Sequence, residues 1–127
     1  MPTVTTGRVL CVDDNRDAAS SLAFLLSVVG YDTRACFDGP SALAEAAAFR
    51  PEVCLLDISM PGMDGYELAH RLRALLGRPR LVAVTAVTGA EFERRAAEAG
   101  FDRWFTKPAD PRELIAALAP SDDPAAD

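Results

Sequence analysis

The chain has 127 residues, a length that fits one domain with a single core. Half of its residues are hydrophobic and a quarter are charged, without the run of about eighteen apolar residues that a membrane span needs, so the composition is that of a soluble globular protein. The net charge of −6 argues against direct binding of nucleic acid, because binding to phosphate backbones requires a basic face.

Five short apolar runs alternate with five helical patterns along the chain. This alternation predicts an α/β fold of repeated βα units, in which a parallel sheet carries helices on both faces. The apolar runs cover residues 8–13, 31–36, 52–57, 80–85 and 102–107. The first, third and fourth are nearly continuous in Val, Leu and Cys, which is typical of strands buried on both faces, whereas the second alternates and indicates an edge strand.

The first three helical patterns are bounded by caps and breakers. The first ends before Gly30, and Asp14 is a candidate for its N-cap. The second ends before Pro51, because the residue that precedes a proline resists the α conformation. Asp64 is expected to cap the third helix.

The last two helical patterns carry start signals of their own. Thr88 and Glu91 match a capping box and predict the start of the fourth helix. Residues 110–113, DPRE, predict an acidic N-cap followed by proline at the first helical position. We therefore expect the fourth helix to begin just after Thr88 and the fifth just after Asp110.

The pattern predicts one folded domain at residues 8–119. Residues 1–7 are expected to be disordered or extended, and residues 120–127 to form a flexible acidic tail. The N-terminus lacks the basic start and apolar stretch of a signal peptide, which predicts a cytoplasmic protein. Cys11, Cys36 and Cys54 lie inside apolar runs and are predicted to be buried, reduced thiols.

Polar residues close four of the apolar runs. Asp13 with Asp14, Asp57, Thr85 and Lys107 stand there, and Lys107 is the only lysine among thirteen basic residues. The carboxyl ends of parallel strands meet at one edge of a sheet, where open α/β folds bind ligands. Each residue taken singly could be a helix cap or a turn former. As a set, clustered carboxylates favour a cation, and oxygen ligands beside a hydroxyl and an ammonium suggest a Mg²⁺-dependent phosphoryl-transfer pocket.

Four motifs carry a resemblance to a known family: VDDN at residues 12–15, LDISMPGMDG at 56–65, VTA at 84–86 and TKP at 106–108. With them the chain resembles the receiver domain of two-component response regulators. The resemblance implies a CheY-like, flavodoxin-like (βα)₅ fold with strand order 2-1-3-4-5. It also implies a phosphoacceptor rather than an enzyme, one that assists its own phosphorylation and slow autodephosphorylation. The phosphoryl donor would be a phosphohistidine on a histidine kinase or histidine phosphotransfer protein.

The resemblance implies roles for the acidic residues. Asp57 would accept the phosphoryl group. Asp13, Asp14, Asp57 and the main-chain carbonyl of Ser59 would hold Mg²⁺, directly or through water.

The resemblance also implies a switch. Thr85 and Lys107 would contact phosphoryl oxygens, and Thr85 would be drawn inward. Trp104 stands where the family usually has Tyr, Phe or His, so it either follows Thr85 as part of the switch or simply packs on the fourth and fifth helices, and that face is expected to bind the downstream protein target. The Lys107–Pro108 bond is expected to be cis. Ser59 and Val87 would tune dephosphorylation, and the apolar Val87 predicts a slow reaction because it cannot orient water.

Other functions stay open at this point. A haloacid-dehalogenase-like Mg²⁺-dependent phosphatase would also use Asp57, but it needs a second acid where Ser59 stands. A flavin or nucleotide binder needs a glycine-rich or hydroxyl-rich loop in place of VDDN. A degenerate receiver would act as a phosphorylation-independent docking module. The length fits either a free single-domain regulator or a receiver cut from a longer chain.

Overall fold

The computed structural model describes residues 7–118, in which five strands alternate with five helices. The predicted acidic tail at 120–127 and all but the last residue of the predicted N-terminal segment lie outside the described residues. In chain order the elements are β1 (Arg8–Val12), α1 (Arg16–Val28), β2 (Asp32–Cys36), α2 (Gly39–Phe49), β3 (Val53–Leu56), α3 (Gly65–Leu76), β4 (Arg80–Thr85), α4 (Ala90–Ala99), β5 (Arg103–Thr106) and α5 (Pro111–Leu118).

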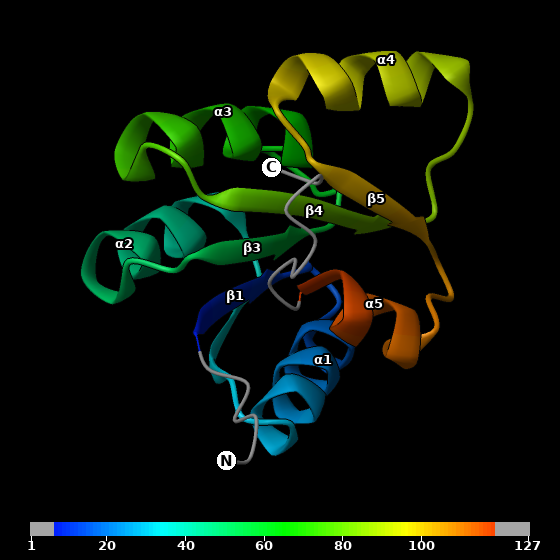
Figure 1. Ribbon diagram of the computed structural model, residues 1–127. Helices are drawn as coiled ribbons and strands as arrows, with labels where there is room; N and C mark the ends of the chain where they lie inside the picture. The colour runs from blue at the N-terminus through cyan, green and yellow to red at the C-terminus, as the bar shows by residue number, and fades with distance from the viewer. Residues whose placement is uncertain (1–6, 119–127) are drawn as a thin grey trace, which may run out of the picture.

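The strands form one parallel sheet in the order β2-β1-β3-β4-β5, which confirms the predicted α/β fold and strand order. The alternating strand β2 lies at an edge, as its sequence indicated. Helices α1 and α5 cover one face of the sheet, and α2, α3 and α4 cover the other (Figure 1). Within residues 7–118, no helix combines the length and the apolar character that crossing a membrane would require.

The sheet divides the interior into two apolar clusters, one on each face, rather than the single core that the length predicted, because successive side chains of a strand point to opposite faces. Leu10, Cys54 and Leu56 pack with α2, α3 and α4, whereas Cys11 and Leu55 pack with α1. All of them are fully or almost fully buried, which fits the near-continuous apolar sequences of β1 and β3. The central strands are thereby fixed from both sides, and so are the residues that follow them.

Two predicted helix starts differ from the structure. Asn15, not Asp14, caps α1, since its side chain accepts a hydrogen bond from Ala18 N. The predicted capping box is absent at α4, whose N-cap is Gly89 and has no side-chain cap bond. Gly89 has φ of 112°, a conformation that favours glycine, and it shifts the helix start one residue beyond Thr88. The predicted caps Asp64 and Asp110 are confirmed by bonds from Glu67 N and Arg112 N.

Candidate acidic site at the carboxyl edge of the sheet

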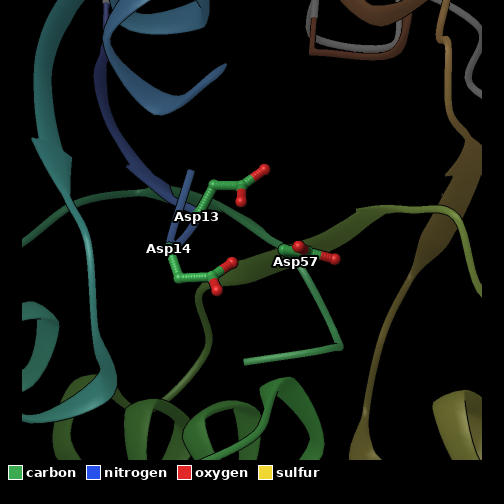
Figure 2. A group of neighbouring side chains, drawn as sticks. All are labelled: Asp13, Asp14 and Asp57. Atoms are coloured by element: carbon green, nitrogen blue, oxygen red, sulfur yellow. The ribbon is translucent and has the colours of Figure 1, made fainter. Parts of the chain in front are cut away.

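Three carboxylates meet at the carboxyl edge of the sheet. Asp13 and Asp14 follow β1, and Asp57 follows the neighbouring strand β3, so their side chains lie close together (Figure 2). One oxygen from each lies within 4.8 Å of the other two. Asp13 and Asp57 are each only 7% exposed, whereas Asp14 is exposed. Two of the three negative charges are therefore buried and require compensation.

Lys107 supplies that compensation from the end of β5. Its Nζ lies 2.5 Å from Asp13 Oδ2 and 3.5 Å from Asp57 Oδ2. Burial lowers the pKa of Lys107, but the hydrogen bond to Asp13 and the charges of Asp57 and Asp13 outweigh burial, so the pKa is raised above its ordinary value. The ammonium is thus held charged between the two buried carboxylates.

Main-chain bonds extend the sheet into the site. Asp13 N donates to Cys36 O at 3.1 Å, and Asp57 N donates to Val12 O at 3.0 Å. On the opposite side, Lys107 N donates to Thr85 O at 2.9 Å. The backbone of every one of these site residues is therefore positioned by the neighbouring strand, which leaves only side-chain rotation free.

Asn15, the last residue of the VDDN motif, is a positioning residue to which the sequence analysis assigned no role. Its backbone N–H donates to Asp13 Oδ1 at 3.0 Å while its side chain caps α1. Asn15 thus ties the orientation of a buried carboxylate to the start of a helix. The one signal in the sequence was a cap-forming residue directly after the acidic pair.

Thr85, at the end of β4, is 1% exposed. Its Oγ1 accepts a hydrogen bond from Val87 N at 3.2 Å. The hydroxyl is therefore engaged with the β4–α4 loop as an acceptor, and its own proton is available to a different partner.

The loop after Asp57 is packed tightly against the start of α3. Gly65 N donates to Ile58 O at 2.9 Å. A Cβ at Gly65 would lie 2.4 Å from Asp57 O, closer than any side chain is tolerated. Gly65 therefore permits a close approach that fixes the backbone of Asp57, which explains a glycine as the first residue of α3.

The remaining residues predicted for the site lie around it. Ser59 is exposed, and its N–H lies 3.4 Å from Asp57 Oδ1. Val87 is partly buried against the α2–α4 side of the sheet. The predicted cis Lys107–Pro108 bond is confirmed.

Trp104 packs on one of the two helices that its sequence position suggested. It lies edge-on against Phe92 of α4, with ring centroids 5.8 Å apart and an interplanar angle of 80°. Its core contacts belong to the α2–α4 face of the sheet, and α5 covers the opposite face (Figure 1). The packing against α4 agrees with one of the two expectations for Trp104, because alternate residues of β5 face opposite sides of the sheet, and its part in a switch stays a prediction.

The three carboxylates fit a small divalent cation. Mg²⁺ binds oxygen at 2.0–2.1 Å, so two ligands on opposite sides of the ion are about 4.2 Å apart. The carboxylate oxygens are separated by distances up to 4.8 Å. Small side-chain rotations or intervening waters accommodate the difference, and Mg²⁺ commonly keeps several waters.

Comparison with known proteins gives a consistent family. The family model of the response regulator receiver domain matches residues 9–119. The DNA-binding response regulator MtrA of Mycolicibacterium paratuberculosis is 38% identical over 109 residues, which cover 86% of this chain and 48% of MtrA. The sensory transduction protein RegX3 of Mycolicibacterium smegmatis is 39% identical over 126 residues, which cover 94% of this chain and 55% of RegX3. The chain thus spans about half the length of these curated relatives.

Solved structures agree with this relationship. Vibrio cholerae chemotaxis protein CheY4 superposes with a TM-score of 0.84 at 28% identity, over 90% of this chain and 97% of CheY4. A CheY-like receiver domain protein from Methanospirillum hungatei superposes equally well at 27% identity, over 90% and 91% of the two chains. The receiver family model covers most of the chain, and the five parallel strands have the order 2-1-3-4-5 that the resemblance implied. The chain therefore belongs to the response regulator receiver domain family.

Proposed function

We propose that this domain accepts a phosphoryl group on Asp57 from a phosphohistidine of a histidine kinase or histidine phosphotransfer protein. The observation that carries the proposal is the joint placement of Asp57, Asp13 and Lys107, with Nζ of the lysine within 3.5 Å of both carboxylates. A carboxylate nucleophile beside a fixed ammonium and an oxygen-rich cation site is suited to phosphoryl transfer, in which charge neutralisation and positioning dominate.

In this reaction a carboxylate oxygen of Asp57 forms a bond to phosphorus while the bond from phosphorus to the imidazole nitrogen breaks. The imidazole nitrogen keeps the electron pair of the broken bond. Asp13, Asp14, Asp57 and the carbonyl of Ser59 would hold Mg²⁺, which neutralises charge on the phosphoryl oxygens. Lys107, already charged and 3.5 Å from Asp57, is placed to pair with one of those oxygens.

The same residues support a switch in the β4–α4 loop. We propose that the hydroxyl of Thr85 donates a hydrogen bond to a phosphoryl oxygen. Because Thr85 Oγ1 is bonded to Val87 N, rotation of this side chain pulls on the loop that leads into α4. Phe92 of α4 contacts Trp104, so a shift of α4 changes the surroundings of that indole. The surface of α4, β5 and α5 would then bind the downstream protein target.

We assign this domain a signalling role in the cell interior, with no direct contact to DNA or a membrane. The net charge of −6 supports the part of this assignment that excludes direct contact with DNA. The name DNA-binding belongs to relatives about twice as long as this chain.

The test uses phosphoramidate, a small donor whose phosphorus–nitrogen bond resembles that of phosphohistidine. Wild type with Mg²⁺ should gain one phosphoryl group per chain, whereas wild type in EDTA and the Asp57→Asn variant should gain none. Asp38→Asn is a matched control, because it removes a carboxylate that caps α2 outside the site. Labelling is read by intact mass spectrometry and Trp104 fluorescence is followed with beryllofluoride.

Three outcomes would contradict the proposal. Undiminished labelling of Asp57→Asn would remove Asp57 as the acceptor. Sustained release of phosphate from p-nitrophenyl phosphate, over many turnovers per chain, would identify a phosphatase. Partner binding that needs neither Mg²⁺ nor Asp57 would identify a docking module.

A further inference from the structure

Three arginines line a hollow at the edge of the sheet opposite the acidic site. Arg8 opens β1, Arg50 lies between α2 and β3, and Arg78 lies between α3 and β4. All three are therefore at the edge of the sheet where the strands begin, and the carboxylates are at the edge where the strands end (Figure 1). The hollow has a volume of about 240 Å³ and also contains Glu52. It belongs to neither the acidic site nor the proposed switch surface.

Seven of the other nine arginines have a carboxylate or an aromatic ring as a partner within the described residues. Four arginines form ion pairs with carboxylates, namely Arg34, Arg71, Arg94 and Arg112. Four lie over aromatic rings, namely Arg16, Arg34, Arg95 and Arg103. The remaining two, Arg73 and Arg80, donate to main-chain carbonyls near the ends of α4 and α5. Within residues 7–118, none of the three guanidinium groups of the hollow has a carboxylate within ion-pair distance.

Two of the guanidinium groups are held in place by main-chain carbonyls. Arg8 Nε donates to Arg50 O at 2.8 Å, and Arg50 Nη1 donates to Leu75 O at 3.3 Å. Each guanidinium has five N–H donors, so most of them remain for a ligand. The donors are therefore preorganised, which lowers the entropy lost on binding.

The backbone of Arg50 is unusual. It has φ of 53° and ψ of 61°, and it is the only described non-glycine residue with positive φ. Glycine suits this conformation best at a helix end. The end of α2 does not itself require an arginine at this position. The side chain of Arg50 does place a guanidinium at the hollow.

The charge of the hollow selects its ligand. Glu52 accepts the backbone N–H of Arg8 at 3.0 Å and offsets one of the three guanidinium charges, which leaves two positive charges. Arginine keeps its charge throughout the physiological pH range. The volume lies below the range typical of drug-sized ligands but accommodates a phosphate group.

From these observations we infer that the hollow formed by Arg8, Arg50 and Arg78 binds the phosphate dianion of a small phosphorylated molecule or of inorganic phosphate. Guanidinium forks match phosphate oxygens in pairs, and the two uncompensated charges match those of the dianion. The remainder of a phosphorylated ligand would extend into solvent.

The experiment titrates inorganic phosphate into the full chain in EDTA at constant ionic strength, followed by amide chemical shifts. Saturable shifts should map to the backbone around Arg8, Arg50 and Arg78. Arg50→Gly should weaken binding at least about tenfold, equivalent to 1.4 kcal/mol, while thermal stability in chloride stays equal or rises because glycine favours this φ. Arg78→Ala should weaken binding as well. Arg71→Ala, which removes the same charge from a surface ion pair of α3, should leave binding unchanged.

A titration of glucose 6-phosphate distinguishes a phosphorylated metabolite from inorganic phosphate as the ligand. If the chain binds glucose 6-phosphate more tightly than it binds inorganic phosphate, the ligand is a phosphorylated metabolite. Equal affinities for Arg50→Gly, Arg71→Ala and wild type would overturn the inference, as would shifts confined to the acidic site. Much tighter binding of an oligo-aspartate peptide than of either phosphate would overturn it in favour of an acidic protein partner. Asp57→Asn should bind phosphate normally, so this result is independent of the proposed phosphoacceptor function.

Discussion

Lys107 is the residue in which composition and structure agree most closely. It is the only lysine among thirteen basic residues, and its ammonium lies between two buried carboxylates. A lysine delivers a compact charge on a flexible stem, whereas the broad planar guanidinium of arginine needs more room. This difference explains why a chain that otherwise uses arginine has a lysine between Asp13 and Asp57.

We expect Lys107→Arg to preserve the fold and to impair phosphorylation-dependent switching. The guanidinium retains the positive charge between Asp13 and Asp57 but lacks the shape to pair with a phosphoryl oxygen in the same space. Circular dichroism and the Trp104 fluorescence response to beryllofluoride together check this expectation. A variant that switches like wild type would show that the shape of the cation does not matter.

Val87 gives a second prediction at this scale. Its apolar side chain cannot orient an attacking water, so Val87→Gln and Val87→Glu are expected to shorten the lifetime of the phosphorylated state about tenfold or more. The side chain also packs on the core, so the free energy of unfolding is measured in parallel. Decay of the label followed by mass spectrometry tests the effect, and an unchanged lifetime in both variants would contradict it.

From the sequence, the site residues that close strands could be predicted, but most of the contacts that these residues make could not. Asp13, Asp57, Thr85 and Lys107 were recognisable because each closes an apolar run. The role of Asn15, and the bond from Val87 N to Thr85 Oγ1, depend on side-chain and loop geometry that one-dimensional patterns do not encode.

At the scale of elements, the loop between β3 and α3 positions Asp57 through contact with Gly65. Gly65→Ala places a methyl group 2.4 Å from Asp57 O and 2.7 Å from Ile58 Cα. We expect it to destabilise the domain by roughly 3 kcal/mol and to reduce phosphoryl acceptance, because main-chain atoms must move.

Gly62→Ala is the matched control in the same loop. Gly62 has φ of 80° but nothing within 4 Å of its Cβ direction, so only the conformational cost of about 1 kcal/mol applies. Urea denaturation measures both variants. Similar losses for the two would show that steric contact with Asp57 is unimportant.

Helix starts show where sequence patterns are ambiguous at this scale. Asp64 and Asp110 cap helices as predicted, whereas Asn15 and Gly89 replaced the expected Asp14 and Thr88. In both cases the correct residue is the immediate neighbour. The strand that precedes each helix sets the point at which the chain can turn, and local propensity alone resolves this point only to within a residue or two.

At the scale of the whole molecule, the buried thiols predict how stability depends on pH. Burial raises the pKa of Cys11 and of Cys54 to about 12, from an ordinary value of 9.0. The folded chain therefore keeps protons that the unfolded chain releases. The contribution of these thiols to stability should be fully present below pH 9 and should fall between pH 9 and pH 12, by up to about 1.4 kcal/mol per thiol and pH unit.

Urea denaturation at pH 8, 9 and 10 measures this decline. The double variant Cys11→Ala, Cys54→Ala should lose stability overall but show a shallower dependence on pH. In wild type, iodoacetamide should modify these two thiols only as the chain unfolds. Rapid labelling of the native chain, or an unchanged slope in the double variant, would refute the prediction.

The contact between Lys107 and Asp13 has a consequence for biosynthesis. The two residues are 94 positions apart, and Lys107 directly follows β5, the last strand among residues 7–118. A nascent chain that ends before β5 carries the three aspartates without their ammonium. We expect such a chain not to assemble the acidic pocket, and under the proposed function unfinished copies would not compete with finished ones for phosphoryl groups.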